Sequence, residues 1–291
     1  MSQIWYNVIY FILWTVALLP LKVLYVISDI LFLIIYYLAG YRKKVVFENL
    51  HNAFPEKTKK EIEQIAIKFY HHFCDLIVEI MKLPRLNEKQ ILKRVNYKNL
   101  EITDEIYRNK KSISGIIGHY NNWEWLNSMS LVLSHKLIGI YKPLSNRAID
   151  LLMLKIRGKY GAIMVPMSSV FKEIIRHEQL QLPSITMFIA DQSPPKSEIR
   201  YRTTFLNQDT PIFLGAEKIA RKMNHAVVFF KMSKVKRGYY DYEPVVLFES
   251  AENVSENEIT DAHVMMLEKQ IIEHPEYWLW THRRWKHKNK Q

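Results

Sequence analysis

The N-terminal segment consists of two apolar runs. Residues 1–21 carry no charged side chain, and about 20 apolar residues are enough for a helix to span a bilayer. The second run, VLYVISDILFLIIYYLA, contains Asp29, and a charge within a membrane is costly unless it faces protein or the interface. Arg42, Lys43 and Lys44 follow as a cytoplasmic flank would. We therefore predict a membrane anchor over residues 1–41, with the first run as the stronger spanning candidate. The alternative is a buried helical hairpin of a soluble fold.

A long amphipathic helix is predicted after the anchor. Thr58 and Glu61 have the spacing of a capping box, and apolar residues recur at helical spacing from Ile62 to Ile80. Pro84 ends the pattern, because proline does not continue a helix.

Beyond residue 110, short apolar runs alternate with helical ones. The expected strands are SISGIIG, LIGIYK, AIMVP, SITMFIAD, AVVFFKMS and YYDYEPVVLF. The expected helices are SSVFKEIIRHE and the segments near 122–133, 147–157 and 211–223. This alternation predicts an α/β fold with a mixed, mostly parallel sheet flanked by helices, and an antiparallel edge hairpin around residues 236–238. We expect one domain over 42–291, with a helical lead-in (42–105) and an α/β core (106–291).

Composition narrows the class of protein. The 291 residues include 41 Lys plus Arg against 29 Asp plus Glu, a formal net charge of +12, and 48% are hydrophobic, which excludes a disordered chain. Cys74 is the single cysteine, so a disulfide scaffold and a thiolate zinc site are both excluded. Residues 1–41 hold one base and one acid, so the excess charge belongs to residues 42–291. An acidic partner is expected for that part of the chain.

Polar side chains follow several of the predicted strands. In open sheets of this type ligands bind at the carboxyl ends of strands. His119 follows SISGIIG, Lys142 follows LIGIY, and Asp191 and Gln192 follow SITMFIA. These residues are therefore candidates for an active site.

His119 and Glu124 have the chemistry of a general base and its orienting carboxylate. Five positions on one continuous helix would rotate them apart by about 140°, so they meet only if a helix begins between them, with Asn121 or Asn122 as its N-cap. The chain has no G-x-S-x-G motif, and Cys74 lies in an apolar helix that keeps it a thiol. The attacking hydroxyl would then belong to the substrate. The alternative is a hydrogen-bonded structural histidine.

The motif GHYNNWEW resembles the bacterial lipid A late acyltransferases, a branch of the glycerolipid-type acyltransferases. The resemblance extends to YRKKVVFENLHNAFPEKTKKE, IYKPLSNRAIDLLMLKIRGKYGA, FIADQSPPKS, TPIFLGAEKIARKM and PEYWLWTHRRWK. It implies acyl transfer from a thioester donor to a hydroxyl of a membrane glycolipid, without a covalent acyl-enzyme.

The resemblance also implies roles for individual residues and partners. His119 is the expected general base and Glu124 its orienting carboxylate, with oxyanion donors among the backbone N–H groups after His119. Substrate binding is assigned to a set of polar residues: Asn122, Lys142, Arg157, Asp191 and Gln192. The expected donor is acyl carrier protein, which is acidic, or coenzyme A, and no further cofactor is expected. The expected site is the cytoplasmic face of the bacterial inner membrane.

Several alternatives concern the same residues. The acceptor could be another membrane lipid, such as an aminolipid, a pigment ester or a phosphoinositide mannoside, and an inert membrane scaffold is a further possibility. The aromatic and basic tail from Trp278 has a nucleic-acid interpretation, which we discount because no nucleic-acid motif accompanies it. His71 and His72 lack metal-ligand spacing, so no metal site is expected. Thr210 is expected to cap the following helix.

Overall fold

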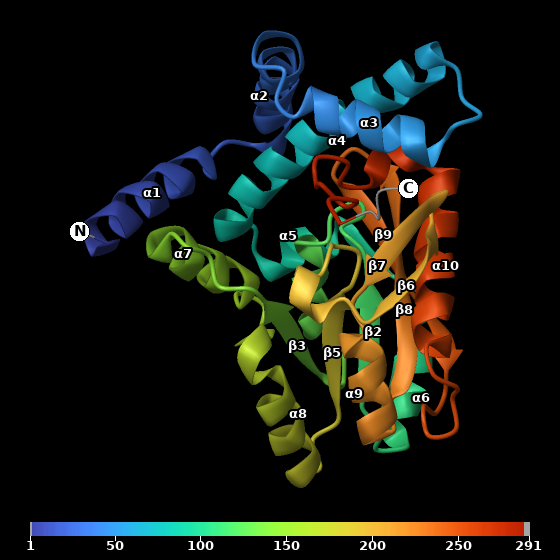
Figure 1. The fold of residues 1–291 in the computed structure, drawn as a ribbon. Helices are drawn as coiled ribbons and strands as arrows, with labels where there is room; N and C mark the ends of the chain where they lie inside the picture. Colours follow the sequence, from blue (N-terminus) through green and yellow to red (C-terminus); the bar gives the residue numbers. More distant parts are fainter. Residues whose placement is uncertain (1, 288–291) are drawn as a thin grey trace.

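A seven-stranded sheet forms the centre of the computed structural model, which describes residues 2–287 (Figure 1). Its strands are β1 (Val95–Tyr97), β2 (Ile113–Ile117), β3 (Lys136–Tyr141), β4 (Ile163–Pro166), β5 (Ser184–Ile189), β8 (Ala226–Lys236) and β9 (Tyr239–Phe248). Their spatial order is β1-β9-β8-β2-β5-β3-β4, and every pair is parallel except β8 and β9. The predicted α/β class with a mostly parallel sheet is confirmed.

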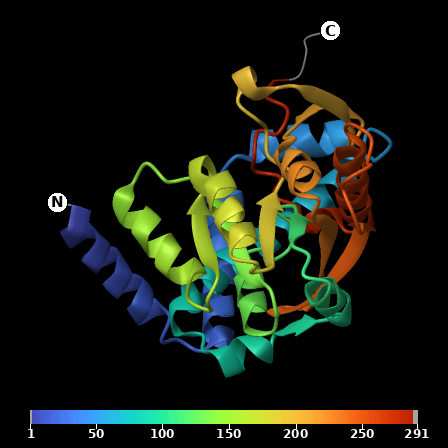
Figure 2. The same ribbon diagram turned by 90° about the horizontal axis from the view of Figure 1, so that it is seen from below.

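Helices lie on both sides of this sheet (Figure 2). The α-helices are α1 (Ser2–Val16), α2 (Leu21–Phe32), α3 (Lys43–Ala53), α4 (Lys59–Lys82), α5 (Glu88–Leu92), α6 (Glu101–Arg108), α7 (Arg147–Arg157), α8 (Val170–Gln179), α9 (Gly215–Met223) and α10 (Glu258–Glu273). A π-helical turn, η1 (Leu33–Leu38), continues α2. The 3-10 turns are η2 (Leu83–Arg85), η3 (Trp125–Leu131), η4 (Met167–Ser169), η5 (Lys196–Glu198) and η6 (Pro275–Tyr277).

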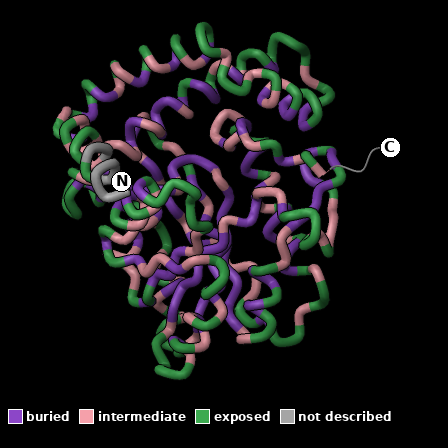
Figure 3. Tube along the Cα trace, turned by 60° about the vertical axis from the view of Figure 1, so that its left-hand side comes forward, coloured by how far each residue is buried: buried purple, intermediate pink, exposed green. Residues whose placement is uncertain are grey.

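The core lies between these helices and the central strands. Every residue of β2 is buried. Figure 3 shows buried (purple) segments gathered at the centre of the molecule. A strand that is buried on both faces is apolar throughout, and this explains why SISGIIG carries no charge. Helix α4 begins at the predicted capping box, in which Thr58 Oγ1 accepts from the Glu61 backbone N–H and the Glu61 carboxylate accepts from the Thr58 backbone N–H.

Two features of the sheet differ from the sequence prediction. The β8–β9 hairpin is antiparallel as predicted, but β1 pairs with β9, so the hairpin does not form the edge of the sheet. A separate antiparallel pair, β6 (Tyr201–Phe205) and β7 (Gln208–Ile212), precedes α9. Thr210 therefore lies in β7, paired with Thr203, and its predicted role as a helix cap is wrong. Its hydroxyl instead accepts a 2.7 Å hydrogen bond from the Trp285 indole.

The N-terminal helices reverse the predicted ranking of the two apolar runs as membrane-spanning candidates. The one helix among residues 2–287 that is long and apolar enough to cross a membrane is Leu21–Leu38, formed by α2 and η1. Helix α1 has 15 residues, or about 22 Å at 1.5 Å per residue, and falls short of a bilayer core. The prediction that the first run is the stronger candidate is therefore wrong. Met1 lies outside the described residues.

The Leu21–Leu38 helix has a protein face and an exposed face. Leu24, Ser28, Phe32 and Tyr36 are buried, and α2 packs on α4. The opposite face exposes a row of large apolar side chains: Val23, Val26, Ile30, Leu33, Ile34, Tyr37 and Leu38. Only 28% of the segment is buried, which is too little for the buried hairpin of a soluble fold.

Candidate active site

Strand register brings His119 and Asp191 together. β2 and β5 are parallel neighbours, and Ile117 pairs with Ile189 at their carboxyl ends. His119 and Asp191 each follow two residues later, so they occupy equivalent positions on adjacent strand ends. The His119 Nδ1 atom lies 2.6 Å from Asp191 Oδ1. The predicted grouping of polar residues at this edge of the sheet is thus present.

Three donors hold the Asp191 carboxylate. Besides the His119 ring, the His119 backbone N–H donates to Oδ2 at 2.8 Å, and the Trp278 indole N–H donates to the same oxygen at 2.7 Å. Burial raises the pKa of Asp191, but the charge of His119 and the hydrogen bonds from His119 and Trp278 outweigh it and bring the pKa to about 2. The carboxylate is therefore ionised at neutral pH.

An ionised Asp191 fixes the tautomer of His119. A carboxylate only accepts hydrogen bonds, so the proton of the neutral imidazole must be on Nδ1, and Nε2 keeps its lone pair. The side-chain nitrogen of Gln192 lies 3.1 Å from Nε2, close enough to donate to it. The ring of Trp123 stands edge-on to the imidazole at 5.1 Å. His119 is thus oriented as a base, with Nε2 facing Gln192.

Glu124 does not hold His119, and the predicted pairing of these two residues is wrong. Its carboxylate instead accepts two hydrogen bonds from Arg157, at 2.9 Å from Nε and 2.5 Å from Nη2. The prediction required a helix to begin between His119 and Glu124. In the structure Asn121 has a left-handed backbone (φ 50°), and the 3-10 helix η3 begins only at Trp125, in place of the predicted helix near 122–133. Glu124 therefore lies before η3 and bonds to α7.

The Asn122 side chain forms hydrogen bonds within the protein. It is fully buried, its Nδ2 donates to Glu79 Oε2 at 2.6 Å, and its Oδ1 accepts from the Trp125 backbone N–H at 3.1 Å. Both side-chain polar atoms have protein partners, and this geometry argues against the predicted contact with substrate. Lys142 is exposed after β3 and remains accessible. Arg157 is held by Glu124, with 26% of its side chain exposed.

One of the oxyanion donors expected after His119 has another partner. The Asn121 N–H donates to the Tyr277 carbonyl at 2.9 Å. This backbone group is therefore not free for an oxyanion, which corrects the expectation for Asn121.

The C-terminal block, residues 275–286, packs against the turn that carries His119 and bonds to its backbone. Tyr120 and Trp278 form an antiparallel bridge, and the Leu279 N–H donates to the His119 carbonyl at 3.1 Å. Trp280 and Arg284 are fully buried. The block is therefore part of the core around the active site, and only some of its cations, such as Arg283 and Lys286, reach the surface.

A buried carboxylate links the N-terminal helices to the His119 turn. Glu79 on α4 accepts hydrogen bonds from Tyr25 at 2.9 Å, from Asn122 at 2.6 Å and from Tyr240 at 2.8 Å. Burial raises the pKa of Glu79 to about 7, although the hydrogen bond from Tyr240 and the charge of Lys234 oppose the shift. Glu79 was not among the residues predicted from the sequence. Two acids four positions apart, Asp75 and Glu79, within an amphipathic helix were the available signal.

Asp29, the charge within the second apolar run, has a protein partner. Arg237 on the β8–β9 turn bonds to Asp29 at 2.7 Å and to Asp75 at 2.6 Å. Ser28 donates to Asp75 at 2.8 Å. The condition for tolerating Asp29, that it faces protein, is therefore met.

Two further features limit the chemistry available here. Cys74 is buried, and burial raises its pKa to about 12, so it is a thiol at neutral pH, as predicted.

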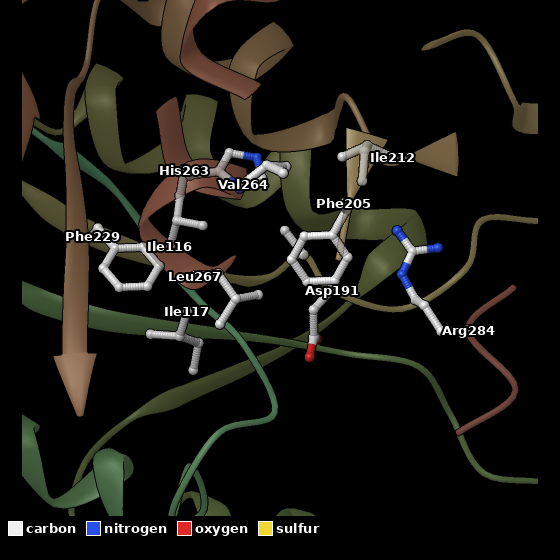
Figure 4. A pocket seen from close by; sticks show the side chains of 11 residues that line it. Ile116, Ile117, Asp191, Phe205, Ile212, Phe229, His263, Val264, Leu267 and Arg284 are labelled. Carbon is white, nitrogen blue, oxygen red and sulfur yellow. The ribbon is translucent and has the colours of Figure 1, made fainter. Parts of the chain in front are cut away.

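A small cavity of about 10 Å³ lies next to Asp191, among side chains that include Phe205, Leu267 and Arg284 (Figure 4). This volume holds about one water molecule and does not accommodate an acyl chain.

Comparison with known proteins identifies the family of the chain. The model of the bacterial lipid A biosynthesis acyltransferase family matches residues 1–287. The chain is 23% identical, over 278 residues, to the lipid A biosynthesis lauroyltransferase of Escherichia coli K12, covering 94% of this chain and 89% of that protein. The resemblance drawn from GHYNNWEW and the other blocks is thereby confirmed. The chain belongs to the bacterial lipid A biosynthesis acyltransferase family, and it is an acyltransferase.

Proposed function

We propose that the protein moves a fatty acyl chain from acyl carrier protein to a hydroxyl of a lipid A-type membrane glycolipid, with His119 as the general base. The observation that carries the proposal is the His119–Asp191 pair, because its 2.6 Å contact leaves the Nε2 lone pair free to take a proton. Family membership supports the lipid acceptor. Asp191, in place of Glu124, is the orienting carboxylate in this proposal.

The proposed reaction has two steps. The acceptor hydroxyl takes the place of the Gln192 amide at His119 Nε2 and gives its proton to that atom while its oxygen attacks the thioester carbonyl. A C–O bond forms and the carbonyl becomes a tetrahedral oxyanion. The oxyanion then collapses, the C–S bond breaks, and the leaving sulfur takes the proton from Nε2. His119 is regenerated as the neutral tautomer, and these steps use no cofactor beyond the acyl donor.

Charge and exposed apolar surface support the donor and the location. A net charge of +12 suits an acidic acyl carrier protein as the donor. The exposed apolar face of Leu21–Leu38 suits contact with lipid, and Arg42, Lys43 and Lys44 follow it. We therefore place the protein at the inner membrane, anchored through residues 1–41, with residues 42–291 on the cytoplasmic side.

The central test is acyl transfer by the purified full chain to a lipid A precursor, with acyl carrier protein and coenzyme A thioesters compared as donors. The His119→Ala variant should lose about 10²- to 10⁴-fold in turnover. His51→Ala, an exposed histidine on α3, is the matched control and should retain activity. Full activity in a folded His119→Ala protein would end the proposed mechanism.

The acceptor and the orientation need separate measurements. Mass spectrometry of lipid extracts from cells with and without the gene should show an acylated lipid A species that depends on the protein. A change confined to an aminolipid, a pigment ester or a phosphoinositide mannoside would assign a different acceptor, and no donor turnover with any acceptor would favour an inert scaffold. Protease digestion of residues 42–291 only from the periplasmic side would contradict the orientation.

A further inference from the structure

A basic groove of about 640 Å³ lies between α3 and the C-terminal block. Figure 1 shows the red C-terminal block beside α3, so segments far apart in the sequence form its walls. The polar residues that line it include Arg42, Lys44, Glu48, Gln208, Arg283 and Lys286. None of them belongs to the His119–Asp191 site or to residues 119–124, so a molecule bound here leaves that site free.

The charges that line the groove are unbalanced. Five cationic side chains face one carboxylate, Glu48. Arg42, Lys44, Arg283 and Lys286 are exposed, and within residues 2–287 none of these four forms a salt bridge with a carboxylate. Clustered cations without acidic partners are costly unless an anion neutralises them. The groove therefore has the electrostatics of an anion site.

The walls of the groove are fixed by hydrogen bonds. The buried Asn49 amide on α3 donates to the carbonyls of Trp280 at 2.9 Å and His282 at 3.0 Å. Arg42 donates to the Thr281 carbonyl at 2.9 Å. These bonds join α3 to the C-terminal block and hold Arg42, so the two walls of the groove are fixed before a ligand arrives, and less entropy is lost on binding.

Gln208 gives an independent indication of a ligand. This residue of β7 lines the groove and is only 3% exposed, yet neither its side-chain oxygen nor its nitrogen has a hydrogen-bond partner in the described structure. A buried amide without partners is costly. Rotation of the side chain to bring its NH₂ group into the groove would let an oxygen-rich anion accept from it.

The position of the groove indicates the kind of anion. It begins at Gly40, directly after the Leu21–Leu38 helix, and the exposed apolar side chains of Leu33, Ile34, Tyr37 and Leu38 precede it. Basic residues at the end of an apolar segment meet the headgroup layer of a membrane. We propose that the groove binds the phosphate headgroup of an anionic membrane phospholipid, whose acyl chains lie against this apolar face.

The test is lipid binding to the detergent-solubilised full chain, measured by native mass spectrometry. Dioctanoyl phosphatidylglycerol should bind saturably and at least about 10-fold more tightly than dioctanoyl phosphatidylcholine. The triple variant Lys44→Gln/Arg283→Gln/Lys286→Gln should lose at least about 10-fold of the phosphatidylglycerol affinity, and this loss should shrink in high salt. Gln208→Leu should lose about 3-fold, because one hydrogen bond to the phosphate is removed.

A matched control separates the groove from general surface charge. Arg108→Gln/Lys172→Gln/Lys218→Gln removes one Arg and two Lys that are exposed on α6, α8 and α9, and it should change the affinity less than about 2-fold. Thermal unfolding checks the fold of each variant. If the groove triple does not fold, Lys44→Gln/Lys286→Gln replaces it, with a loss of about 5-fold expected.

Several outcomes would overturn the proposal. The first two are equal affinity for the two phospholipids and an equal loss of phosphatidylglycerol affinity in the control triple variant. The third is complete displacement of phosphatidylglycerol by inorganic phosphate at equal concentration. The fourth is displacement of phosphatidylglycerol by the lipid A precursor. The last outcome would assign the groove to the glycolipid acceptor. Because the readout does not require acyl transfer, failure of this proposal leaves the proposed reaction intact.

Discussion

Two carboxylates near the carboxyl ends of the central strands each hold a basic side chain, and the pairs differ in what they can do. Asp191 bonds to the imidazole of His119, a side chain that can exist with or without its second proton. Glu124 bonds through both oxygens to Arg157, whose guanidinium is permanently charged. The first pair can move protons and the second cannot. Comparing them shows that the basic partner, and not the presence of a carboxylate, decides whether a pair is suited to proton transfer.

The largest effect is expected for Asp191→Asn. An asparagine at this position can present its NH₂ group to His119 Nδ1, which favours the tautomer with the proton on Nε2 and removes the lone pair that takes the substrate proton. We expect turnover to fall by about 10³- to 10⁴-fold. The measurement is the acyl-transfer rate with saturating donor. A folded Asp191→Asn protein that keeps most of its activity while Glu124→Gln loses it would reverse the roles of the two pairs.

Breaking the second pair should cost stability more than chemistry. Glu124→Gln leaves the half-buried Arg157 without its counter-charge, and we expect the free energy of unfolding to fall by about 3 kcal/mol. The double variant Glu124→Gln/Arg157→Gln should recover part of this loss. Chemical denaturation of both single variants and the double variant gives the coupling free energy. A coupling free energy near zero would mean that the contact between the two side chains does not stabilise the fold.

The smallest effect is expected for the pH dependence of stability, through Glu79, which bonds to Asn122 between the two pairs in sequence. Its pKa is about 7 in the folded chain, above the ordinary 4.5, so the folded state holds a proton that the unfolded state has already released. Its contribution to stability is fully present below pH 4.5 and is lost as pH rises through about 7. We expect this contribution to fall by about 2 kcal/mol between pH 5 and pH 7 and to be absent in Glu79→Gln. Denaturation at several pH values measures the slope, and equal slopes in both proteins would contradict the assignment.

Sequence patterns predicted the long regular elements well. Helix α4 has a capping box at its start and an apolar stripe, and α7 follows the Asn146 cap, so local chemistry determines where both begin. The pair β6 and β7 was missed because YRTTF and QDTPI are polar and short, and such segments do not show a strand period. β1 has three residues and was missed for the same reason.

The candidate site was predicted in its members but not in its pairing. His119, Asp191 and Gln192 were all named from their positions after strands, yet Glu124 was given the role that Asp191 holds. Closeness in sequence favoured Glu124, whereas the contact depends on β2 lying next to β5, and strand order is not encoded in the apolar period of either strand. The hydrogen bond from Trp278 to Asp191 could not be predicted for the same reason, because it joins segments far apart in the chain.

The position of the C-terminal block has a consequence for biosynthesis. The last part of the chain supplies the Trp278 bond to Asp191 and the Leu279 bond to the His119 carbonyl. A ribosome synthesises these residues after His119 and Asp191, because they follow both in the sequence. Until the C-terminal block emerges, a nascent chain carries His119 and Asp191 without the segment that holds them. The pair can therefore take up its folded geometry only after this block has been translated.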